Sequence, residues 1–146
     1  MLRVILGLAA LAVATTAVLA QNTAAISQRK DAMKALGGAA KDPGTMAKGE
    51  AAFDLAKVQA SLKTIEATAA KAKTLFPADS KDGDTAALPV AFTDQPDLFA
   101  KFDALGAAAK AAQAAIKDEA TFKTEWPKVA ANCGGCHKVY RAPPKK

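Results

Sequence analysis

The feature that most constrains this chain is the run Cys133-Gly134-Gly135-Cys136-His137, close to the C-terminus. It contains both cysteines of the 146-residue chain and its only histidine. On a helix, residues three or four positions apart share a face, so the two thiols and the imidazole would point the same way. Cys-x-x-Cys-His is typical of covalent haem attachment, in which the thiols bond the porphyrin and the imidazole binds its iron. The two glycines cost a helix interior about 1 kcal/mol each relative to Ala, but they let a flat ring approach the backbone.

We therefore expect one haem c, anchored by Cys133 and Cys136 and ligated by His137. A disulfide between cysteines three apart would close a very small loop and stabilise little. A structural zinc site normally has four ligands, and the chain has no third Cys and no second His. A thiol redox protein remains an alternative, although such proteins place the first cysteine at a helix N-terminus, whereas this pair ends a helical pattern.

The N-terminal segment, residues 1–20, has the pattern of a secretory signal. Arg3 is the positive residue, Val4 to Ala14 form the apolar run, and small residues ending at Ala20 form the cleavage site. An uncleaved membrane anchor is less favoured, because the run is shorter than the ~20 apolar residues that span a bilayer. We expect residues 1–20 to be a signal peptide and residues 21–146 to form one domain in the bacterial periplasm, since these thioethers are made outside the cytoplasm.

The charge of the chain indicates which partners to expect. The formal net charge is +6, and removal of the signal takes away one Arg and no acid, which leaves +5. The lysines are spread along the chain, so we expect mild electrostatic steering towards acidic redox partner proteins. No basic stripe is interleaved with aromatic residues, which argues against nucleic acid binding. We expect no membrane association after signal cleavage.

The mature chain is rich in Ala, Lys and Leu, which favours helix. Apolar spacing predicts four helices that begin near Thr23, Asp54, Pro96 and Asp118. The two aspartates are suitable N-caps. Apolar stripes are predicted on each helix: Ile26, Met33, Gly37 and Ala40; Leu55, Val58, Leu62, Ile65, Ala69 and Ala72; Leu98, Phe102, Leu105, Ala109, Ala112 and Ile116; Phe122, Trp126, Val129, Cys133, Cys136 and Tyr140.

Two prolines are expected to disturb these helices. Pro43, followed by glycine, should distort or end the first helix near Asp42, and Pro127 should kink the last. Residues 75–95 are predicted to be a long irregular connection. We interpret it as a crossover between the ends of the bundle, packed down by its own phenylalanines, with a partner-docking loop as the alternative.

The short first and third links and the longer middle link predict an all-α, antiparallel four-helix bundle. Many of its core positions are alanine, which makes a thin apolar core for this length. A bound haem c would add buried apolar area, at roughly 25 cal/mol per Å². We therefore expect the haem-free chain to be loosely packed and to lack a sharp near-ultraviolet circular dichroism signal.

The second axial ligand of the iron cannot be histidine, because there is only one. After signal removal two methionines remain, Met33 and Met46. On one helix they would be separated by about 20 Å, so both cannot bind the same iron. Met33 lies on the predicted apolar face and is the better candidate. Its alternative role is core packing, which is what most buried methionines do.

The sequence CGGCH followed by Lys-Val-Tyr-Arg, late in an exported helical chain, resembles class II c-type cytochromes over essentially Gln21 to Lys146. The resemblance implies a four-helix bundle with a covalent haem c. It also implies a role for each of the following residues: Cys133 and Cys136 as thioether anchors, His137 as proximal ligand, Arg141 as a shield of the proximal face, and Arg29, four residues before Met33, as a partner of a haem propionate. The alternative for both arginines is exposed surface charge.

The stretches MAKGEAAFDLA and LFPADSKDGDTAALP resemble the low-spin branch of these proteins, cytochrome c-556, in which a methionine bonds the iron. The resemblance thus implies that Met33 is an iron ligand and that the protein carries single electrons. The alternative is a five-coordinate, cytochrome c′-like iron that binds nitric oxide or other small gases. No enzymatic activity is expected, because a single histidine committed to iron cannot serve as a general base. The protein is expected to be a monomer or a homodimer.

Overall fold

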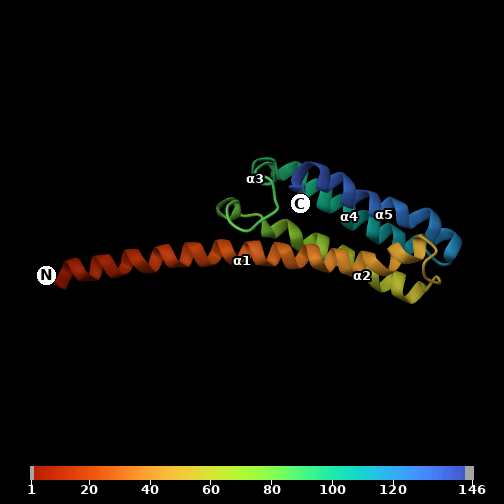
Figure 1. Ribbon diagram of the computed structural model, residues 1–146, viewed down its shortest axis with the longest axis horizontal. Coiled ribbons are helices and arrows are strands. Elements are labelled where there is room, and N and C mark those ends of the chain that lie inside the picture. The colour runs from red at the N-terminus through yellow and green to blue at the C-terminus, as the bar shows by residue number, and fades with distance from the viewer. Residues whose placement is uncertain (1, 144–146) are drawn as a thin grey trace.

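The computed structural model describes the backbone of residues 2–143 and the side chains of residues 23–143. Its elements, in chain order, are α1 (Leu2–Ala47), α2 (Leu55–Ala72), the 3-10 turns η1 (Lys73–Leu75) and η2 (Ala78–Ser80), α3 (Val90–Thr93), α4 (Gln95–Ala115) and α5 (Glu119–Tyr140). The long helices α1, α2, α4 and α5 run alternately up and down, and the N-terminal part of α1 projects well beyond the bundle (Figure 1). This arrangement confirms the predicted all-α four-helix bundle.

The predicted signal peptide, residues 1–20, lies outside the residues whose side chains are described. The backbone of α1 passes through it and continues into the bundle without a break (Figure 1). The signal peptide and its cleavage therefore stay predictions. Among the described residues, no helix combines enough length with enough apolar character to cross a membrane.

The prediction that the first helix ends near Asp42 is wrong, because α1 continues through Pro43 to Ala47, while the distortion predicted at Pro43 stays a prediction. Pro43 and Met46 are both buried, so packing outweighs the hydrogen bond that proline cannot donate. After Ala47 the chain leaves the helix through Gly49, which has a φ of 75°, a conformation that glycine adopts without steric cost. Its N–H donates to Met46 O and that of Glu50 to Thr45 O, which is a Schellman C-cap. α5 likewise runs through Pro127 as one helix, and the kink predicted there stays a prediction.

Both predicted N-caps are confirmed. The Asp54 carboxylate accepts a hydrogen bond from Lys57 N at 3.0 Å, in front of α2. The Asp118 carboxylate accepts from Thr121 N at 2.8 Å. The two residues form a capping box in front of α5, in which each satisfies a backbone donor of the other. These caps fix where the two helices begin, and therefore which of their faces turn inward.

Replacement of Asp118 with Ala should lower the urea midpoint of the haem-loaded protein at pH 7. The hydrogen bonds from Thr121 lower the pKa of Asp118. The stabilisation by this carboxylate is therefore fully present above its unfolded pKa of about 3.9, and it is lost as the pH falls through the lower folded value. The deficit of the Ala variant should shrink on acidification. Asp118→Asn, which keeps a cap without the charge, is the control. An Ala deficit that is the same at pH 7 and in acid would contradict this assignment.

The buried apolar side chains form two clusters. The central cluster is Met46, Val58, Leu62, Ile65, Ala69, Leu105, Ala109, Ala112, Ile116, Phe122, Trp126 and Val129. The connection cluster is Ala32, Ala72, Leu75, Phe76, Ala91, Leu98, Phe102 and Tyr140. The predicted stripes of α2 and α4 are thus largely confirmed, except that Leu55 is exposed. The stripe predicted for the first helix was wrong in part: Gly37 is exposed, whereas Arg29 and Ala32 are buried.

The connection between α2 and α4 is packed by its own side chains, as its interpretation as a crossover predicts. Phe76 is buried, and its ring centroid lies 5.9 Å from that of Phe92. The end of the connection also pairs with the end of α5. Leu88 N donates to Tyr140 O at 2.9 Å, and Ala142 N donates to Ala86 O at 2.8 Å.

Candidate functional site

The Cys-x-x-Cys-His motif lies in the last turns of α5, inside one unbroken helix. Its spacing therefore places Cys133, Cys136 and His137 near one face, as predicted. Both cysteines are free thiols. Cys136 is half-buried, whereas Cys133 and His137 are exposed, so the expectation that both thiols lie on the buried stripe of this helix was wrong for Cys133. The exposed side of α5 near His137 is therefore accessible to a bound group.

An apolar cavity of roughly 260 Å³ opens between α1 and α5, next to Cys133. Its lining comes from four helices: Leu36, Ala40, Gly44, Ile65, Leu105, Trp126, Val129, Ala130 and Cys133. None of these lining residues carries a charged side chain. Small-molecule sites usually measure ~300–1,000 Å³, so this cavity can enclose only part of a group as large as a porphyrin.

Met33 and Cys136 are brought together by the connection cluster. Both are half-buried and pack against it, one from α1 and the other from α5. Met46, the other methionine considered, is 6% exposed and belongs to the central cluster instead. Met33 thus packs against the same apolar cluster as Cys136, and Met46 is not part of that cluster.

The environment of the motif sets the protonation of its side chains. Partial desolvation raises the pKa of the Cys133 and Cys136 thiols, and the positive charge of Lys101 offsets part of the rise at Cys136. Partial desolvation also lowers the pKa of His137, and the charge of Arg141 lowers it further. At neutral pH the imidazole is therefore uncharged, which is the form that binds a metal.

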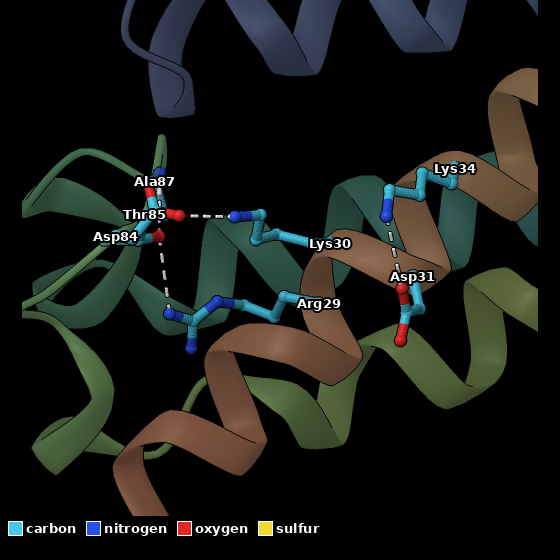
Figure 2. Close-up of polar contacts among 7 residues, drawn as sticks. All are labelled: Arg29, Lys30, Asp31, Lys34, Asp84, Thr85 and Ala87. Atoms are coloured by element: carbon cyan, nitrogen blue, oxygen red, sulfur yellow. Dashed lines mark hydrogen bonds and ion pairs between the residues drawn. The ribbon is translucent and has the colours of Figure 1, made fainter.

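Arg29 is buried rather than exposed, and its guanidinium is bound to the connection. Nη1 donates to Leu75 O at 2.8 Å and to Ser80 Oγ at 2.5 Å, and Nη2 donates to Ser80 O at 2.7 Å and to Thr85 Oγ1 at 3.4 Å. Figure 2 shows its side chain extending from α1 towards Thr85. The exposed-charge alternative is therefore wrong for Arg29, while Arg141 is exposed. The propionate role of Arg29 and the shielding role of Arg141 stay predictions.

Sequence reasoning missed one polar contact at the motif. The hydroxyl of Tyr140 donates to Asp97 Oδ2 at 2.6 Å, which ties the end of α5 to the first turn of α4. This hydrogen bond lowers the pKa of Asp97, and the nearby Lys101 lowers it further. Burial and the same hydrogen bond raise the pKa of Tyr140. The partners are 43 residues apart, so no local pattern indicates their pairing.

The residues at this site fit a covalently bound haem. Two free thiols and a neutral imidazole share one face beside an apolar cavity, which is the donor set that the group requires. A Cβ at Gly134 or Gly135 would meet no atom within 4 Å, so protein packing does not demand glycine there. Glycine at these two positions would let a flat ring approach the backbone closely. Among the described residues, no group of three or more His, Cys, Asp or Glu side chains could hold a metal ion by itself.

Comparison with known proteins gives the same assignment. Residues 24–141 match the sequence model of the family described as Cytochrome C'. The chain is 51% identical to a cytochrome c′ of Rhodopseudomonas palustris over 124 residues, which are 82% of this chain and 83% of that protein. It is 35% identical to a cytochrome c-556 of Agrobacterium fabrum over 117 residues, 80% of each chain.

The fold agrees with a solved structure of cytochrome c′ from Rhodopseudomonas palustris. The TM-score is 0.80 at 48% sequence identity, and the match covers 83% of this chain and 98% of that one. Fold, motif and family match therefore coincide on the same residues. The chain belongs to the cytochrome c′ family of helical-bundle haem proteins, which carry a covalently attached haem c and serve in electron transfer or gas binding.

Proposed function

We propose that this protein carries single electrons through one haem c, to whose iron His137 and Met33 would supply the protein ligands. The observation that supports this most is that Met33 packs against the same apolar cluster as Cys136. The haem, when bound, supplies the one-electron redox chemistry. Cys133 and Cys136 tether it, and the neutral imidazole of His137 is available to its iron. The thioether of Met33 is an uncharged ligand that favours the reduced state.

The surroundings of these residues suit electron transfer rather than catalysis. The cavity at Cys133 is mostly apolar, and we assign the single histidine of the chain to the iron. A ligand pair that stays in place in both oxidation states leaves no open position for a substrate. We therefore assign no catalytic residue.

Export, partners and assembly belong to the same proposal. The N-terminal pattern of residues 1–20 supports transport to the periplasm. A mature charge of +5, from lysines spread along the chain, supports transient encounters with acidic redox proteins. The protein acts as a monomer or a homodimer, without nucleic acid and without a membrane anchor once the signal is removed.

Gas binding by five-coordinate iron is the second candidate. The identity of 51% to a protein named cytochrome c′, against 35% to one named cytochrome c-556, favours it. In that case Met33 only packs, and small gases such as nitric oxide bind on its side of the haem. The two candidates differ in one contact, that between Met33 and the iron.

The absorption spectrum of the ferric holoprotein should separate the two candidates. We expect a low-spin spectrum with a sulfur-to-iron charge-transfer band, and slow binding of nitric oxide, because the methionine must leave first. A high-spin ferric spectrum with rapid nitric oxide binding would instead support the gas-binding protein. Absence of any haem would leave the thiol redox alternative.

A further inference from the structure

We propose that Arg29 is a positioning residue that fixes the turn of α1 carrying Met33 relative to the end of α5 carrying His137. It does so through the connection between α2 and α4, which is bound to both helices. The inference rests on the proposed function, because it concerns the contact between Met33 and the iron. It assigns to Arg29 a role in the ligation of the haem that does not require a propionate.

Arg29 is held in place from several directions. It is 4% exposed, and the guanidinium carbon lies 5.2 Å from the ring centroids of both Phe76 and Phe92. Its two terminal nitrogens donate to acceptors that span residues 75–85. Ser80, which supplies two of the acceptors, has no exposed surface. A planar, forked guanidinium matches these acceptors, whereas an ammonium group does not. Exchange of Arg29 for Lys should therefore lose some of these hydrogen bonds.

The connection is tied to α5 immediately after its last contact with Arg29. Thr85 accepts from Arg29, and the next residue, Ala86, accepts from Ala142 N. Two residues further, Leu88 N donates to the carbonyl of Tyr140, one helical turn beyond His137. Hydrogen bonds therefore link α1, which carries Met33, to the connection, and link the connection to the end of α5, which carries His137.

The connection is also pressed directly against α1. A Cβ at Gly83 would lie 3.1 Å from Ile26 Cδ1, and the φ of Gly83 is 108°. Next to it, Lys30 Nζ pairs with Asp84 Oδ2 at 2.6 Å (Figure 2). The Lys30 side chain is 48% exposed and that of Asp84 is 93% exposed, so this ion pair contributes little. Lys30 therefore offers a matched control: it lies on the same helix and contacts the same connection, but from the surface.

The position of Met33 depends on Arg29 because the two residues are one helical turn apart on α1. A buried donor that loses its acceptors must find others or move towards water. A weakened Arg29 contact would thus free this turn of α1 to shift, and with it the Met33 thioether. His137 would be unaffected, since α5 is fixed independently by the bond from Tyr140 to Asp97.

The test uses the haem-loaded full chain in four forms: Arg29→Lys, the double variant Ser80→Ala with Thr85→Val, the combination of all three changes, and the control Lys30→Gln. The readouts are the low-spin fraction of the ferric spectrum, the rate of nitric oxide binding, and hydrogen exchange of the amides of residues 29–36 and 83–88. We expect Arg29→Lys and the double variant each to raise the binding rate about tenfold, within the usual range of coupling between sites. The combination should add little to either, and Lys30→Gln should match the unchanged protein.

The double variant separates this role from a propionate contact, because it removes the two side-chain acceptors, Ser80 Oγ and Thr85 Oγ1, and leaves Arg29 and the two backbone acceptors in place. If it matched the unchanged protein in all three readouts, the proposal would be overturned. A high-spin spectrum of the unchanged protein would refute Met33 ligation alone. The positioning role would then be decided by hydrogen exchange: faster exchange in both segments for Arg29→Lys and for the double variant supports it, and unchanged exchange overturns it.

Discussion

Replacement of both Cys133 and Cys136 with Ser will abolish covalent haem attachment completely. Protein made together with the haem-attachment machinery, and then denatured, should carry the mass of one haem, while the double variant should carry none. Each single variant should keep one thioether. The reason is chemical, since the two free thiols are the only cysteines of the chain.

The physical state of the double variant should change as well. The alanine-rich core leaves an apolar cavity beside Cys133, so without the ring the side chains around Trp126 lose a packing surface. We expect its near-ultraviolet circular dichroism signal to broaden and weaken. Ala131→Ser, a change at an exposed position of the same helix, is the control and should keep both haem and signal. If the protein with both cysteines present carried no added mass, and its two thiols were free or paired with each other, the haem assignment would be refuted. Thiol redox chemistry would then be favoured.

Replacement of Met33 with Ala should convert the ferric protein from low spin to high spin and remove the charge-transfer band. Nitric oxide should bind faster and more tightly, because its binding position would be open in a larger fraction of the protein. If the form with Met33 bound to iron exceeds the form with an open position by about 100 to 1 before the replacement, the apparent affinity for nitric oxide should rise about 100-fold after it. The reduction potential should fall, because a neutral thioether favours reduced iron.

Met46→Leu is the matched control for this experiment. Met46 is buried in the central cluster. A volume-conserving change of this kind costs less than about 1.5 kcal/mol of stability. The spectrum of this variant should equal that of the unchanged protein. Identical high-spin spectra for the unchanged protein and Met33→Ala would show that Met33 only packs, and the gas-binding function would then be preferred.

The parts of the fold that local chemistry determines could be predicted from the sequence. Asp54 and Asp118 cap α2 and α5 where expected, because an N-cap depends on residues within one turn. Val58, Leu62 and Ile65 are buried as their spacing indicates. The motif on α5 is equally local, which is why its identification with a haem site agrees with the family match.

The features that could not be predicted depend on residues distant in sequence. Pro43 lies inside α1 with its side chain fully buried, and this packing overrides its poor helix propensity. Arg29 looks like a surface charge on its helix, since its acceptors are 46 to 56 residues away. Tyr140 finds Asp97 in the same way. In each case tertiary contacts decide the outcome, and the local pattern carries no signal of them.

The sequence positions of the two proposed iron ligands have a consequence for biosynthesis. If haem attachment uses only the residues of the motif, it can precede tertiary structure. Met33, by contrast, lies 104 residues before His137, so the proposed binding of one iron by both residues would close a loop of most of the chain. Such long loops close late during folding. If Met33 binds the iron as proposed, the colour of the maturing protein would report two successive events, an early chemical one and a late one that marks completion of the bundle.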